Sequence, residues 1–123
     1  MILVDTSIWI DHLRTANKEL QRLLHAELVL SHSFVIGELA LGQLPQRRVF
    51  LADLQDLPRA MMASDAEVLR FIDDNDLSGL GIGYIDAHLL AAARLTNRAS
   101  IWTRDKRVMK VAERLNLAAI LPQ

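Results

Sequence analysis

The chain begins with a short run of apolar residues that stops at an acid, Ile2-Leu3-Val4-Asp5. A run in which every residue is apolar, without alternation, is typical of a strand that is buried on both faces of a parallel sheet. Because parallel strands need crossover connections, usually helices, this feature favours a sheet with helices on both faces. The fold class expected from it is α/β.

Apolar periodicity and turn signals divide the rest of the chain into helices and short strands. Ser64 and Glu67 form a capping-box pattern that opens a helix with Val68, Leu69 and Ile72 on its apolar face. Other helices are expected around Leu20–Leu24, from Ser31 or Ser33 to Gly42, from Arg47 to Leu57, from Tyr84 to Arg98 and through Val108–Leu115. Further apolar or β-rich runs at Leu28–Leu30, Arg59–Ala63, Ser100–Thr103 and Ala118–Leu121 predict a mainly parallel sheet of about five short strands.

Several classes of protein are excluded by composition. The 123 residues contain no cysteine, which excludes disulfides, cysteine zinc sites, iron–sulfur clusters and a thiol nucleophile. No unbroken apolar run approaches the roughly 18 residues of a membrane span, and Asp5 interrupts the first apolar stretch before it could serve as a signal peptide. We find no internal repeat or linker. We therefore expect a single cytoplasmic domain over residues 1–123.

Three aspartates are expected near the edge of the sheet where the strands end. Asp5 follows one strand directly, and Asp105 follows Ile101-Trp102-Thr103 by one residue. Asp86 lies in the first turn of the helix that comes after Gly79, Gly81 and Gly83. Ligands of open α/β sheets bind at the carboxyl ends of the strands. The alternative is that these aspartates only cap helices or complement their dipoles.

Glu38 is a fourth candidate acid, because it sits between Ile36 and Leu39 in a largely apolar helix. The alternative is an ordinary exposed helical glutamate. Four carboxylates gathered at one edge would raise one another's pKa values and would need a compensating cation. A hard divalent ion such as Mg²⁺ or Mn²⁺ suits oxygen ligands, and it could support phosphodiester cleavage.

These residues occur in motifs that resemble those of the PIN-domain ribonucleases, in particular the VapC-type toxins of bacterial toxin–antitoxin pairs. The similar blocks are Val4-Asp5-Thr6-Ser7, the helical Glu38, Asp86-Ala87-His88-Leu89-Leu90-Ala91-Ala92-Ala93 and Ile101-Trp102-Thr103-Arg104-Asp105. They occur in the same order as in the family and span nearly the whole chain. The resemblance implies a PIN-like α/β/α sandwich.

The resemblance also implies an activity. Asp5, Glu38, Asp86 and Asp105 would hold one or two Mg²⁺ or Mn²⁺ ions in an endoribonuclease that cuts structured RNA such as tRNA or rRNA, leaving a 5′-phosphate and a 3′-hydroxyl. Ser7 would support the acidic site through hydrogen bonds, and Thr103 is expected to do likewise.

Two protein partners are implied by the same resemblance. One is a cognate VapB-type antitoxin that covers the acidic pocket, and the other is a second copy of the chain. The apolar residues of 34–41 and 50–57 are the candidate dimer faces.

A cluster of cations surrounds the last candidate acid. The chain has a net charge of −1, so its overall field does not attract nucleic acid, but Arg104, Lys106, Arg107 and Lys110 lie beside Asp105. They could hold RNA phosphates without reading sequence. The alternative is the solvated face of a helix whose other face is core.

Two other classes of function compete with the nuclease. A non-catalytic module could keep the acidic pocket only to hold a partner or RNA. A phosphoacceptor receiver domain has a similar length and a Mg²⁺-binding acidic pocket, but receivers have adjacent acids after the first strand, whereas Thr6 follows Asp5 in this chain.

Overall fold

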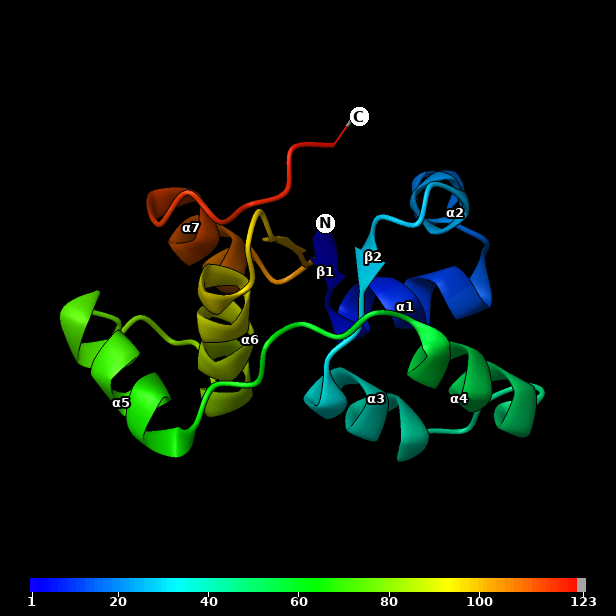
Figure 1. Ribbon diagram of the computed structural model, residues 1–123, viewed down its shortest axis with the longest axis horizontal. Helices are drawn as coiled ribbons and strands as arrows, with labels where there is room; N and C mark the ends of the chain where they lie inside the picture. The colour runs from blue at the N-terminus through cyan, green and yellow to red at the C-terminus, as the bar shows by residue number, and fades with distance from the viewer. Residues whose placement is uncertain (122–123) are drawn as a thin grey trace.

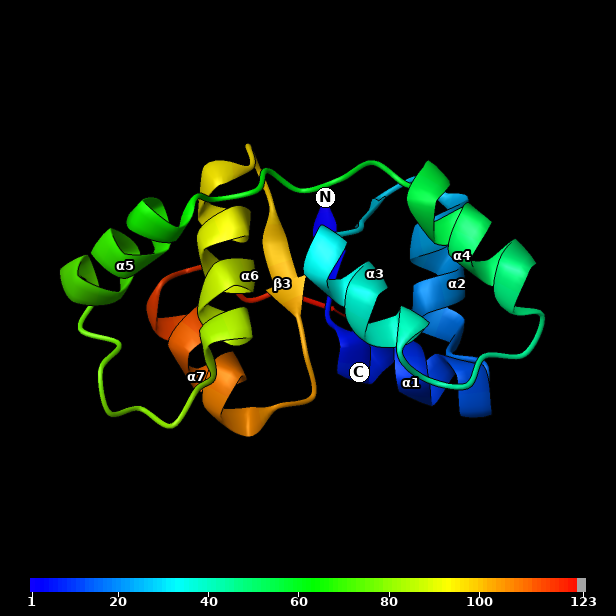
Figure 2. The ribbon, with the colours of Figure 1, turned by 90° about the horizontal axis from the view of Figure 1, so that it is seen from below.

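The computed structural model describes residues 1–121. Within this range the elements follow in the order β1 (Ile2–Val4), α1 (Thr6–Arg14), α2 (Lys18–His25), β2 (Val29–Leu30), α3 (Ser33–Ala40), α4 (Arg47–Asp56), α5 (Asp65–Asp74), α6 (Tyr84–Leu95), β3 (Ser100–Trp102) and α7 (Lys106–Arg114). Helices α1 to α4 lie on one side of the central strands and α5 to α7 on the other (Figures 1 and 2). The expected α/β class is confirmed.

The sheet has the order β2-β1-β3, and both of its strand pairs are parallel. Leu3 of β1 is opposite Leu30 of β2 and Ile101 of β3. The N-terminal strand is therefore central. Because all three strands run in the same direction, their carboxyl ends meet at one edge, where Asp5 follows β1.

The expectation of about five strands is wrong, because the described residues form only three. Arg59–Ala63 contributes a single bridge between Arg59 and Ser31. Its pairing with the chain after β2 stops there because α3 begins at Ser33, two residues after Ser31. At the other edge, Ala118 makes a single bridge to Ile101, and β3 ends one residue later.

The helices agree with the sequence except in three respects. Helix α1 was not assigned, although Asp5 is a suitable N-cap and its side chain accepts from the Thr6 N–H. Leu69, expected on the apolar face of α5, is 58% exposed. Helix α6 ends at Leu95 instead of Arg98, since the chain turns there and Arg98 adopts a φ of 57°.

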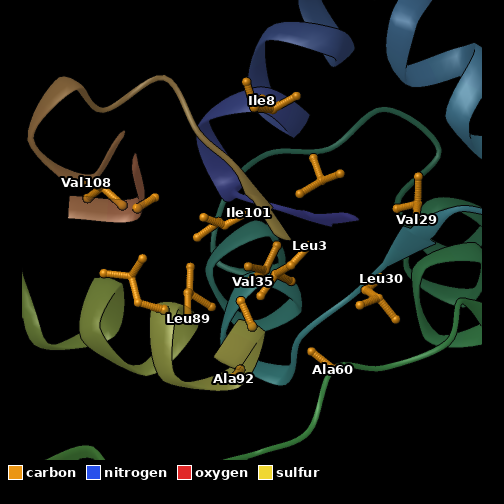
Figure 3. Packing of buried hydrophobic residues seen from close by; sticks show 14 of the residues in the cluster. Leu3, Ile8, Val29, Leu30, Val35, Ala60, Leu89, Ala92, Ile101 and Val108 are labelled. Atoms are coloured by element: carbon orange, nitrogen blue, oxygen red, sulfur yellow. The ribbon is translucent and has the colours of Figure 1, made fainter. Parts of the chain in front are cut away.

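The core lies between the strands and the helices on either side of them. Leu3 and Ile101 from neighbouring strands meet Val35 of α3 and Leu89 of α6 (Figure 3). All four side chains are fully buried. Helix α6 carries Ala91, Ala92 and Ala93 on buried positions, and such small residues allow the helix to approach its neighbours closely. This packing fixes the strand ends from which the acids extend.

None of the helices in residues 1–121 is long and apolar enough to cross a membrane.

Candidate functional site

Asp5 is the most buried of the four candidate acids, at 9% exposed. Its Oδ1 accepts from the Thr6 N–H at 2.8 Å, so it caps α1. Its Oδ2 accepts hydrogen bonds from the Ser7 hydroxyl at 3.2 Å and the Thr103 hydroxyl at 2.7 Å. Both residues expected to support the acidic site thus contact this carboxylate. Three donors therefore hold this carboxylate in one orientation.

Thr103 connects two of the candidate acids. Its hydroxyl donates to Asp5 and accepts from the Asp105 N–H at 3.1 Å. Asp105 in turn caps α7, because its Oδ1 accepts from the N–H groups of Arg107 at 2.9 Å and Val108 at 3.1 Å. Asp5 and Asp105 therefore belong to one hydrogen-bonded network, although they lie 100 positions apart in the sequence.

Asp86 is half-buried and lies in the first turn of α6. Its Oδ2 accepts from the Gly83 N–H at 2.9 Å. Burial raises the pKa of Asp86, and the negative charges of Asp5, Asp105 and Glu38 raise this pKa further, whereas the Gly83 hydrogen bond lowers it. All three other candidate acids are therefore near enough to act on Asp86 electrostatically.

Glu38 is exposed on α3, in agreement with the alternative of an ordinary exposed helical glutamate. Its Oε1 accepts a hydrogen bond from the Thr6 hydroxyl at 2.6 Å. Sequence reasoning assigned no role to Thr6, although it stands between Asp5 and Ser7 in a motif rich in hydroxyls. Thr6 links the first turn of α1 to α3 and orients the glutamate.

The capping interpretation of the three aspartates and the site interpretation are compatible. In each aspartate one carboxylate oxygen accepts from the backbone near the start of a helix. Among residues 1–121, the second oxygens of Asp86 and Asp105 accept no hydrogen bond from the protein. Capping thus fixes the side chains while leaving an oxygen for a ligand.

The donor set suits a hard divalent cation, since it consists of carboxylates and hydroxyls without a soft ligand. Within the described range, however, no three His, Asp or Glu side chains are gathered closely enough to form a ready metal cage. Mg²⁺ usually retains several waters and takes only one or two carboxylates, so a looser arrangement of acids still fits such an ion.

The four cations near Asp105 do not act as one group. Arg104 forms an ion pair with Asp11 of α1, and its N–H donates to the Ser7 hydroxyl at 3.2 Å. Arg107 extends in another direction, to the glycine loop, where its Nη1 is 3.5 Å from the Gly81 carbonyl oxygen. Lys106 and Lys110 are exposed on α7. The side chains of Arg104 and Arg107 therefore contact different parts of the molecule.

Comparison with known proteins gives a consistent result. The sequence matches the model of one family, described as the PIN domain, over residues 2–114. It is 46% identical over 108 residues to Ribonuclease VapC32 of Mycobacterium tuberculosis, in strain CDC 1551 / Oshkosh and equally in strain H37Rv. Each alignment covers 88% of this chain and 87% of the relative.

A solved structure has a similar fold. The crystal structure of FitAcB from Neisseria gonorrhoeae superposes with a TM-score of 0.64, covering 92% of this chain and 94% of the other. The sequence identity is 21%, so this similarity concerns the fold alone.

Proposed function

This chain belongs to the PIN-domain family and is of the VapC type, and from that premise we propose that it is a divalent-metal-dependent endoribonuclease toxin. Its substrate is structured RNA, tRNA or rRNA, and its partner is a cognate VapB-type antitoxin. A relative of similar length and 46% identity carries the name ribonuclease. The match to the PIN domain covers residues 2–114, which leaves the receiver-domain alternative without support.

The observation that carries the proposal is the electrostatic coupling of Asp86 to the other acids. Asp5, Asp105 and Glu38 all raise its pKa, in addition to burial. Like charges near one another destabilise a fold unless a cation compensates them, and perturbed carboxylates are enriched at functional sites. Residues 1–121 place no cationic side chain within ion-pair distance of these four acids.

Each acid has a defined part in the proposed reaction. Asp5, Glu38, Asp86 and Asp105 would hold one or two Mg²⁺ or Mn²⁺ ions. When bound, such an ion supplies positive charge at the scissile phosphate and makes water a better nucleophile at neutral pH. Ser7 and Thr103 fix Asp5 through hydrogen bonds, and the Thr6 hydroxyl holds Glu38. The Gly83 N–H holds Asp86 through one carboxylate oxygen and leaves the other oxygen for the ion.

A comparison of the wild-type protein with Asp5→Asn tests this function. Both proteins are purified identically and incubated with a pool of tRNA and rRNA, with Mg²⁺, with Mn²⁺ and with a chelator. We expect discrete fragments with 5′-phosphates from the wild type only, abolished by the chelator. The Asn side chain keeps the shape of Asp5 but lacks its charge, so circular dichroism should show the same fold.

Equal fragment patterns from both proteins would contradict the nuclease and would favour the non-catalytic binding module. Binding of the pool without cleavage would lead to the same conclusion. Direct binding of Mn²⁺, measured by calorimetry on the wild type and on Asp5→Asn, provides a readout that does not depend on activity.

The antitoxin proposal is supported by a groove of about 340 Å³ beside Glu38. It lies between α1 and the segment that follows α3. Its lining includes Ile10, Leu13, Leu39, Leu44 and Pro45, with Arg14 and Glu38 as the charged members. An apolar segment of a partner would fill it and cover the adjoining acids. Expression without an antitoxin should then arrest growth, and unimpaired growth at high soluble yield of the active protein would contradict this.

A second copy of the chain is the other proposed partner, and the protein should then be a dimer in solution. The candidate faces at 34–41 and 50–57 use much of their apolar surface in the core, where Val35, Leu39 and Leu54 are buried. Leu41 and Val49 remain exposed, at 91% and 58%. Light scattering during gel filtration gives the mass directly, and a monomeric mass would contradict the dimer.

A further inference from the structure

A basic groove lies along α7, on the side that faces the loop between α5 and α6. Its volume is about 290 Å³, and it is lined by Leu80, Arg107, Lys110, Val111 and Arg114. Three of the five lining residues are cations. Their positions, three and four residues apart, put them on one face of the helix.

Two of these cations are fixed in place by the loop. Arg114 Nη2 donates to the Asn75 carbonyl at 2.6 Å, and Arg107 Nη1 makes a longer contact of 3.5 Å with the Gly81 carbonyl. A guanidinium has five N–H donors, so each of them keeps most of its donors for a ligand. In the described part of the chain no carboxylate lies within ion-pair distance of Arg107, Lys110 or Arg114.

The dimensions of the row match a nucleic-acid backbone. From Arg107 to Arg114 the helix rises by about 10 Å. An RNA strand carries one phosphate per nucleotide, and a row of this length can contact more than one of them. It begins two residues after Asp105 and leads away from the acids along α7.

We infer that this groove holds the sugar–phosphate backbone of the RNA strand that continues from the scissile bond. The inference rests on the proposed function and adds to it a direction: the bound strand runs from Asp105 along α7, toward Arg114. Arg114 was not among the residues expected to bind RNA. Arg104, which pairs with Asp11, contributes least of the cations near the site.

The test measures RNA binding without cleavage, in an Asp5→Asn background, with fluorescently labelled total tRNA at several KCl concentrations. Lys110→Ala is compared with Lys18→Ala, which makes the same charge change in α2. That helix lies on the opposite side of the central strands from α7 (Figure 1). We expect Lys110→Ala to weaken binding several-fold and to reduce the slope of log K against log salt by about 0.7 to 0.9. Lys18→Ala should leave both unchanged.

Equal slopes and affinities for Lys110→Ala and Lys18→Ala would overturn the inference, and so would the absence of any tRNA binding. Lys110→Gln and thermal melting of every variant guard against a loss of fold. Cleavage by the protein with Asp5 intact is measured in parallel. If the protein with Asp5 cleaves RNA but Lys110→Ala and Lys18→Ala have equal salt slopes, only the proposed groove is rejected. If Lys110→Ala weakens RNA binding but the protein with Asp5 does not cleave, only the proposed nuclease activity is rejected.

Discussion

The hydroxyl of Thr103 donates a hydrogen bond of 2.7 Å to Oδ2 of Asp5, across a separation of 98 residues. The same hydroxyl accepts from the Asp105 N–H, so one buried side chain, 4% exposed, joins the ends of β1 and β3. A hydrogen bond to a buried charged group stabilises a fold more than one between neutral groups. Thr103 thus contributes both to stability and to the placement of two acids.

Thr103→Val should therefore lower the free energy of unfolding by about 1–3 kcal/mol, because valine keeps the shape but leaves Asp5 without a buried donor. It should also reduce RNA cleavage. Thr103→Ser retains the hydroxyl and is the matched control. Urea unfolding and the cleavage assay measure the two effects, and a valine variant as stable and active as the serine variant would refute this role.

Thr6→Val should slow cleavage with little change in stability. The hydrogen bond from Thr6 to Glu38 is exposed, so its loss affects the orientation of the glutamate more than the fold. We expect kcat to fall by up to about tenfold, which corresponds to roughly 1.4 kcal/mol. Thr6→Ser keeps the donor and should retain kcat, and equal rates for the two variants would remove Thr6 from the site.

Part of this site follows from sequence alone. Asp5 and Asp105 were expected at the sheet edge because a strand end and an adjacent acid form a local pattern. The contact of Thr6 with Glu38 spans 32 residues, and no local pattern encodes it. The pairing of Arg104 with Asp11 has the same character, because it depends on how α1 packs beside the loop before α7.

The fold shows the same division between local and tertiary information. Capping by Ser64 and Glu67 was predictable, because both hydrogen bonds of the box lie within a few residues. The exposure of Leu69 was not, because it depends on which face of α5 meets α6. Strand length was equally hidden, because it depends on where the chain beside Arg59 turns away from the sheet into α3.

Gly79→Ala and Gly81→Ala should have similar effects on stability and different effects on RNA binding. Both residues have a φ of 78°, so each alanine is destabilised by about 1–2 kcal/mol. A Cβ at Gly81 would stand 2.6 Å from Nη1 of Arg107, whereas a Cβ at Gly79 meets nothing within 4 Å. Gly81→Ala should thus displace the guanidinium and weaken tRNA binding, as measured by fluorescence.

The double variant Gly81→Ala/Arg107→Ala controls for this displacement. Without the Arg107 side chain there is nothing left to displace, so Gly81→Ala should have no further effect on tRNA affinity. A weakening of the same size in both backgrounds would show that Gly81 acts independently of Arg107.

Acid should destabilise the protein through His32. Burial, together with the charges of His88 and Arg59, lowers the pKa of His32 from its ordinary 6.5 to about 4. Between these two values the unfolded chain binds a proton that the folded chain does not, so stability is lost as the pH falls from about 6.5 to about 4. The loss from this group is at most on the order of 3 kcal/mol.

His32→Asn separates this contribution from that of other groups. Asparagine is a good N-cap and can replace the ring nitrogen Nδ1, which accepts from the Phe34 N–H at 3.0 Å. Urea midpoints measured from neutral pH down to about pH 4 should vary less in this variant than in the wild type. His25→Asn, at an exposed position of α2, should keep the wild-type dependence, and an unchanged slope in His32→Asn would contradict the assignment.

The central place of β1 has a consequence for synthesis of the protein. Because β1 pairs with β3, and Asp5 receives a hydrogen bond from Thr103, 98 residues later, neither the sheet nor the acidic site is complete until both segments have been synthesised. Such long sequence separations delay folding until both partners are available. The acidic site therefore cannot assemble before Thr103 and Asp105 have been synthesised, so a translation product interrupted before them would lack the proposed nuclease activity.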